Sequence, residues 1–104
     1  MSEIASFENK VQELKPNTKK PPMFDVILLN DDFTPMDFVV YVLKEIFNHT
    51  DQQANKIMLT VHNEGEASCG IFTKDLAETK SYEVNNLAKI NDHPLISIVK
   101  PIYD

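Results

Sequence analysis

The side chains best suited to chemistry follow a short apolar run. Residues 26–29, Val-Ile-Leu-Leu, lead directly into Asn30, Asp31 and Asp32. Paired carboxylates are the residue types of general acid–base catalysis. Adjacent aspartates in one turn, however, do not face each other as such a pair must, and Asn and Asp gather in strand-to-helix turns for local reasons. Taken alone, the turn favours a structural role.

Two helical faces are predicted near this turn. Met36 follows it by one helical turn, and Met58, Val61 and His62 have i, i+3, i+4 spacing, so they share one face. If the two helices are antiparallel neighbours, the polar turn adjoins both methionines, which fill irregular spaces and serve adaptable binding pockets. The alternative is that both methionines are ordinary core residues.

Metal and cofactor sites are not expected. His49, His62 and His93 form no HExxH motif and no i, i+4 pair, and Cys69 is the single cysteine. The chain therefore offers neither an intramolecular disulfide nor a cysteine-based zinc site. With only two glycines, it also lacks the glycine-rich loops that cradle phosphates.

A cysteine hydrolase is the remaining enzymatic hypothesis, with Cys69 as the nucleophile and His62 as the base. Cys69 lies in a predicted strand, with Ala67 and Ile71 expected on the same face. A buried, inert thiol is the favoured reading. No GxSxG motif suggests a serine nucleophile either. We expect no catalytic residues.

The elements that position these side chains begin with a strand at residues 23–30. A helix is expected after it, with Thr34 as the N-cap, Pro35 in the first helical position and Asp37 three residues after the cap. This helix should stop near residues 48–49. Its amphipathic stripe consists of Met36, Val39, Val40, Leu43, Ile46 and Phe47.

The second half of the chain predicts two more helices and two more strands. One helix starts after Thr50 or Asp51 and ends at Gly65, and a strand covers residues 66–73. Thr73 caps a helix over residues 74–90, and a last strand covers residues 95–100. The residues of the last helix expected to face inward are Leu76, Ala77, Val84, Leu87 and Ala88. The order β-α-α-β-α-β predicts an α+β domain with helices on one face of a three-stranded sheet.

Composition adds the domain organisation and several exclusions. The 104 residues suffice for one domain, which we place at 23–104, after a flexible, Pro- and Lys-rich tail at 1–22. The net charge of −6 divides into −7 for the domain and +1 for the tail. Because there is no arginine and the domain is acidic, neither nucleic-acid nor anionic-membrane binding is expected. Since no secretory signal or membrane-spanning run is present, we expect a cytoplasmic protein. Nothing in the sequence suggests more than a monomer.

Five segments together resemble the ClpS family of protease adaptors. In family order and spacing they are residues 26–39, 58–65, 69–73, 77–80 and 93–95. The resemblance covers residues 23–100 approximately. It implies a protein that recognises other proteins by a first residue of Leu, Phe, Tyr or Trp. It also implies delivery of these N-degron substrates to the N-terminal domain of a ClpA- or ClpC-type AAA+ unfoldase that works with ClpP, without a cofactor.

The resemblance also implies roles for the residues introduced above. A free α-ammonium presents three N–H donors, for which Asn30, Asp31 and neutral His62 offer acceptors, with Asp32 in support. Flexible Met36 is the expected gate, which crowds β-branched Val and Ile. The apolar pocket for the first side chain is expected to consist of Met36, Met58, Val61 and Leu95, with Leu29, Thr34 and Val39 in its wall.

The contact with the unfoldase is expected on another face. By resemblance, the candidates are Asp75, Glu78, Thr79 and Lys80, although the family more often has Glu in place of Asp75. The alternative is a solvated helix start, where acidic residues are favoured in any case. A competing function is a protein-interaction module like the C-terminal domain of the ribosomal stalk protein. That module shares the element order but lacks the Asn-Asp-Asp turn and the Met-x-x-x-His helix face.

Overall fold

The computed structural model describes residues 21–103. Within them the predicted β-α-α-β-α-β order and the α+β class are confirmed. The predicted tail at 1–22 lies outside the described residues except for Pro21 and Pro22, so its separation from the domain stays a prediction. The elements are β1 (Met23–Leu29), α2 (Met36–Glu45), α3 (Asp51–Glu64), β2 (Glu66–Thr73), α4 (Lys74–Ile90) and β3 (Ile96–Ile102).

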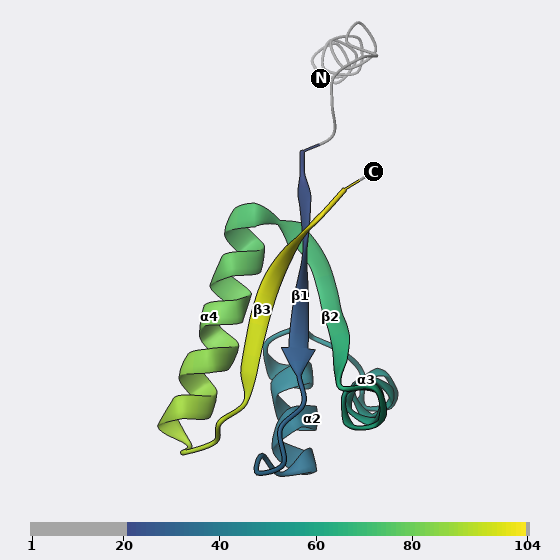
Figure 1. Ribbon diagram of the computed structural model, residues 1–104, viewed down its shortest axis with the longest axis vertical. Helices are drawn as coiled ribbons and strands as arrows, with labels where there is room; N and C mark the ends of the chain where they lie inside the picture. Colours follow the sequence, from purple (N-terminus) through teal and green to yellow (C-terminus); the bar gives the residue numbers. More distant parts are fainter. Residues whose placement is uncertain (1–20, 104) are drawn as a thin grey trace, which may run out of the picture.

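β1 is the central strand of an antiparallel sheet with the order β2-β1-β3. The helices lie beside and behind this sheet, with α4 along β3 and α3 next to β2 (Figure 1). Val26 and Leu28 are fully buried in the cluster beneath the helices, whereas Ile27 between them is buried at 7% exposure but lies outside that cluster. The alternation of side chains along a strand explains this division.

The helices bury stripes that the apolar periodicity largely predicts. In α2 the buried positions include Val39, Val42 and Leu43, but Met36 is 45% exposed. In α4 the prediction for Leu76 is wrong, since this side chain is 46% exposed. The buried stripe of α4 consists instead of Ala77, Ser81, Val84 and Ala88, with Leu87 packed at its margin.

The start of α2 also differs from the prediction. Its N-cap is Pro35, which has extended backbone angles, and no side chain caps the helix. The predicted capping pair of Thr34 and Asp37 does not form, because the Thr34 hydroxyl donates to Asp31 instead. The helix ends at Glu45, earlier than predicted. By contrast, α3 begins and ends as predicted, with Thr50 capping Gln53 and Gly65 in the left-handed conformation.

A bulge in β2 explains why one predicted face is wrong. Val26 pairs with Gly70 and Ile27 pairs with Ser68, so Cys69 has no partner on β1. The extra residue shifts the alternation of side chains. Cys69 is therefore buried, whereas Ile71 is 53% exposed. The two residues do not share a face.

Candidate functional site

The turn after β1 is built around the carboxylate of Asp31. Its Oδ1 atom accepts hydrogen bonds from the backbone N–H groups of Phe33 (2.8 Å) and Thr34 (2.7 Å). The Thr34 hydroxyl donates to both carboxylate oxygens, at 3.0 and 2.8 Å. The backbone N–H of Asn30 donates to the carbonyl of Gly65, at 2.9 Å, which ties the turn to the end of α3. These hydrogen bonds fix the shape of the turn and its position next to the end of α3.

The ionised form of Asp31 is favoured in this turn. Partial burial alone would raise the pKa of Asp31, but the hydrogen bonds from Thr34 and Phe33 oppose it, helped by the nearby charge of His93. The balance lowers the pKa of Asp31 below its ordinary value. His93 was missed as a site residue by the sequence analysis. Its place directly before Pro94 and Leu95 was the signal available.

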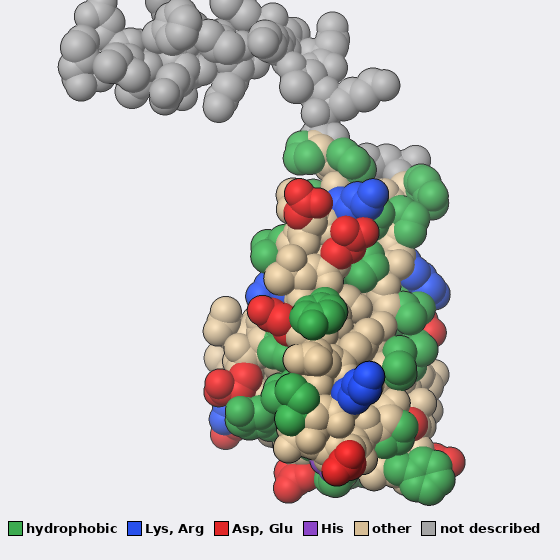
Figure 2. All heavy atoms as spheres, turned by 90° about the vertical axis from the view of Figure 1, so that its left-hand side faces the viewer, with side chains coloured by type: hydrophobic (Ala, Val, Ile, Leu, Met, Phe, Trp, Pro, Cys, Tyr) green, Lys and Arg blue, Asp and Glu red, His purple; other side chains and the backbone are tan. Residues whose placement is uncertain are grey.

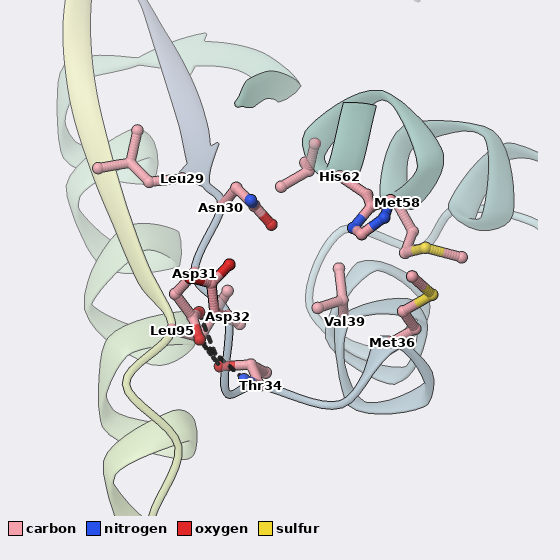
Figure 3. A pocket seen from close by; sticks show the side chains of 11 residues that line it. Leu29, Asn30, Asp31, Asp32, Thr34, Met36, Val39, Met58, His62 and Leu95 are labelled. Carbon is pink, nitrogen blue, oxygen red and sulfur yellow. Dashed lines mark hydrogen bonds between the residues drawn. The ribbon is translucent and has the colours of Figure 1, made fainter. Parts of the chain in front are cut away.

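A cavity of about 170 Å³ opens next to this turn, between α2, α3 and the approach to β3. It brings together all eleven residues predicted for the amine clamp, its support and the apolar pocket (Figure 3). They are Leu29, Asn30, Asp31, Asp32, Thr34, Met36, Val39, Met58, Val61, His62 and Leu95.

The cavity has an apolar interior and polar groups at its mouth. Val39, Met58, Val61 and Leu95 are all less than a tenth exposed. Asn30, Asp32 and His62 are exposed, and Met36 stands partly exposed at the rim. Figure 3 shows the Asn30 amide and the His62 ring on the two sides of the opening, with the side chains of Met36 and Met58 close together. The arrangement suits a ligand with an apolar group and a hydrogen-bonding end.

The two adjacent aspartates differ in what their carboxylates do. Asp31 accepts bonds from its own turn, as the dashed lines in Figure 3 mark. Among residues 21–103, no hydrogen bond or ion pair engages the carboxylate of Asp32, which is exposed. The carboxylate of Asp32 is therefore available beside the cavity to accept hydrogen bonds from a ligand. The carboxylate of Asp31, by contrast, already accepts hydrogen bonds from within the turn.

The predicted unfoldase-contact residues fall into two groups. Asp75, Glu78 and Thr79 are exposed in the first turns of α4, where they border a shallow hollow together with Tyr82, which the sequence analysis did not single out. The side of the molecule on which α4 lies carries acidic, hydrophobic and a few basic side chains interspersed (Figure 2). Lys80 does not border that hollow.

The Lys80 side chain instead contacts the end of α2 and strand β2. Its Nζ atom donates to the carbonyl of Ile46, just past the end of α2, at 2.7 Å. The same atom lies 5.4 Å from the ring centre of Phe72 and 5.7 Å from that of Phe47. These contacts join α4, β2 and the end of α2 through one ammonium group.

Nothing in the described residues supports the hydrolase hypothesis. Cys69 does not border the cavity that contains His62. Burial, together with the charge of Asp25, raises the pKa of the Cys69 thiol to about 12, so the reactive thiolate is scarce near neutral pH. No group of three or more potential metal ligands occurs within residues 21–103. In the same residues no helix is long and apolar enough to cross a membrane.

Comparison with known proteins agrees with this geometry. The sequence model of the family described as ATP-dependent Clp protease adaptor protein ClpS matches residues 19–98. The solved structure of Agrobacterium tumefaciens ClpS2 bound to L-phenylalaninamide superposes with a TM-score of 0.78 and 37% sequence identity. That match covers 80% of this chain and 100% of the Agrobacterium chain. Both comparisons favour an adaptor over the stalk-like module, and the chain belongs to the ClpS family of Clp protease adaptors.

Proposed function

We propose that this protein binds the free N-terminal amine and the large hydrophobic first side chain of N-degron substrates and delivers them to a Clp protease. The observation that carries the proposal is the cavity with an apolar interior and acceptor groups at its mouth. The ligand of the Agrobacterium relative, L-phenylalaninamide, has these two parts: a free α-amine and a benzyl side chain. The first residues accepted are Leu, Phe, Tyr and Trp.

The amine clamp consists of Asn30, His62 and the aspartate pair. The Asn30 carbonyl and an unprotonated nitrogen of His62 accept two of the three ammonium hydrogens. Asp32 supplies the third acceptor, because its carboxylate is free, and a charge-assisted bond is the strongest kind available. Asp31 shapes the turn and adds negative charge. This assignment gives Asp32 a more direct part than the sequence alone suggests.

The first side chain enters between Met36 and the buried wall of Val39, Met58, Val61 and Leu95. Met36 forms the gate because it is partly exposed at the rim and its unbranched side chain can adapt to a planar or γ-branched group. A side chain branched at Cβ is wide next to the backbone, where it would have to pass the Met36 side chain. The gate therefore disfavours Val and Ile as first residues.

Delivery uses the end of the molecule opposite the cavity. Leu29, which borders the cavity, pairs with Glu66 at one end of the sheet, and Met23 pairs with Thr73 at the other. Because Thr73 is the N-cap of α4, Asp75, Glu78 and Thr79 lie at this second end. A monomer can therefore hold a substrate and an unfoldase together. The partner proposed is the N-terminal domain of a cytoplasmic ClpA- or ClpC-type unfoldase with ClpP.

A reconstituted degradation assay tests the proposal. Two fluorescent reporter proteins that differ only in a first residue of Phe or Ala are incubated with a Clp unfoldase, ClpP and ATP. Adding this protein should accelerate the loss of the Phe reporter and leave the Ala reporter unchanged. Equal rates for the two reporters with both ClpA- and ClpC-type unfoldases would contradict the proposed function.

A further inference from the structure

One wall of the cavity depends on the approach to β3. Leu95 is 2% exposed and lies in the short connection between α4 and β3. The other residues that border the cavity come from β1, the turn after it, α2 and α3. The position of Leu95 therefore depends on how the start of β3 is held. That strand is at an edge of the sheet, with β1 on one side only.

Asn85 of α4 binds the outer edge of β3 at Ser97. The backbone N–H of Ser97 donates to Asn85 Oδ1 at 2.7 Å, and Asn85 Nδ2 donates to the Ser97 carbonyl at 3.3 Å. One side-chain amide thus satisfies both backbone groups of a residue, as a neighbouring strand would. These bonds fix Ser97, two residues after Leu95, to the middle of α4.

A buried pair of hydroxyl groups strengthens this attachment. The Oγ atoms of Ser81 and Ser97 lie 2.7 Å apart, and Ser97 Oγ also donates to Asn85 Oδ1 at 3.1 Å. The two serines are 7% and 3% exposed in a core that is otherwise apolar. A satisfied polar network in such surroundings specifies one arrangement of its elements. Here it sets where α4 lies along β3.

The connection between α4 and β3 is also bonded to α4 on the side that precedes Leu95. The backbone N–H of His93 donates to the carbonyl of Ala88 at 2.8 Å, and Asp92 adopts a left-handed conformation with a φ of 60°. The connection is thus bonded to α4 on both sides of Leu95: through His93 before it and through Ser97 after it.

We infer that Asn85 is a positioning residue for substrate binding: it acts through Ser97 to hold Leu95 in the pocket wall. The inference rests on the proposed function. It assigns no contact between Asn85 and substrate, since Asn85 does not border the cavity. Loss of the amide frees the edge of β3, so Leu95 can move away from the bound side chain.

Two substitutions of Asn85 distinguish the effect of the hydrogen bond from the effect of side-chain size. Asn85→Asp keeps the oxygen that accepts from the Ser97 N–H, whereas Asn85→Leu has a similar size and no acceptor. Calorimetry with a Phe-initiated peptide should give a dissociation constant about tenfold higher for the Leu variant, which corresponds to about 1.4 kcal/mol and lies within the range that one such hydrogen bond contributes. The Asp variant should stay within about threefold of the wild type.

Val84→Ala is the matched control for a loss of stability. Val84 precedes Asn85 and is fully buried in the core, and its truncation leaves the bonds to Ser97 intact. This variant should bind the peptide as the wild type does at a temperature where it is folded. Equal weakening by the Leu and Asp variants, no weakening by either, or equal weakening by Val84→Ala would overturn the inference.

A measurement on the wild-type protein tests the inference without requiring that any variant folds. Peptide binding and the attachment of Ser97 must favour each other. The amide exchange of Ser97 should therefore slow on addition of the Phe peptide more than that of Val99, further along β3. Equal slowing would overturn the inference. Failure of the wild type to bind any Phe peptide would refute the proposed function itself, and the inference with it.

Discussion

At the scale of single residues, the Asn-Asp-Asp turn shows why residue types alone do not assign roles. The family resemblance implied that Asn30, Asp31 and His62 belong together, and they do border one cavity. Which aspartate is free depends on hydrogen bonds to Phe33 and Thr34, whose directions follow from the path of the turn. The influence of His93 on Asp31 joins parts of the chain that are far apart, and in the sequence only the position of His93 directly before Pro94 and Leu95 pointed to it.

The aspartate pair gives a first prediction. Asp31→Asn should lower the free energy of unfolding by about 1 kcal/mol, because one oxygen and the charge that organise the turn are lost. Asp32→Asn should leave unfolding unchanged and should weaken binding of a Phe-initiated peptide. Urea denaturation and calorimetry on both variants check this. If Asp32→Asn destabilises the fold and binds normally, the two roles are reversed.

The same comparison predicts a pH dependence. Since folding lowers the pKa of Asp31, its ionised form stabilises the fold above the ordinary range of an aspartate. This contribution is lost as the pH falls through the lowered pKa. The wild type should therefore be more stable than Asp31→Asn near neutral pH, and this difference in unfolding free energy should shrink in strong acid. A difference that persists in strong acid would contradict the role of the carboxylate charge.

The gate makes a prediction about selectivity. Met36→Ala should improve binding of Ile- and Val-initiated peptides relative to Phe-initiated ones, because the truncated side chain leaves room beside Cβ. Competition against a labelled Phe peptide measures the ratio. Phe33→Ala is a suitable control, since Phe33 is exposed beside the site and does not border the cavity. An unchanged ratio in Met36→Ala would show that another residue sets the selectivity.

At the scale of elements, the periodic patterns predicted every helix and strand that occurs within residues 21–103, and the errors have local causes. The start of α2 differs from the predicted start because Thr34 bonds to Asp31 rather than capping the helix. The bulge in β2 placed Cys69 and Ile71 on different faces, and bulges have no periodicity to reveal them. Leu76 is apolar yet lies beside the buried stripe, so hydrophobicity alone misplaced it.

The contacts of Lys80 with the end of α2 and with β2 give it a role in the stability of the fold. Lys80→Met should lower the free energy of unfolding by about 1–2 kcal/mol, through loss of the bond to the Ile46 carbonyl and of the contacts with two rings. Urea denaturation measures this. Lys89→Met, an exposed position on the same helix, should have no effect. Equal stability of the two variants would show that Lys80 does not join the elements.

At the scale of the whole molecule, the fold separates the proposed substrate cavity from the proposed unfoldase contact. The cavity lies where β1 ends, and the exposed start of α4 lies where β1 begins. The acidic character of residues 23–104 favours a cationic N-terminus at long range, although salt screens such attraction beyond about 10 Å. Sequence patterns could predict the class and the order of elements. They could not place the two sites at opposite ends, because that follows from strand pairing.

The proposed function requires that the cavity recognise a free α-amine together with an apolar first side chain. Calorimetry with a short Phe-initiated peptide and its N-acetylated twin tests it directly, because acetylation removes the charge and two N–H donors and leaves the side chain unchanged. The free peptide should bind, and the acetylated peptide should show no detectable binding. Equal affinity for the two peptides would contradict it.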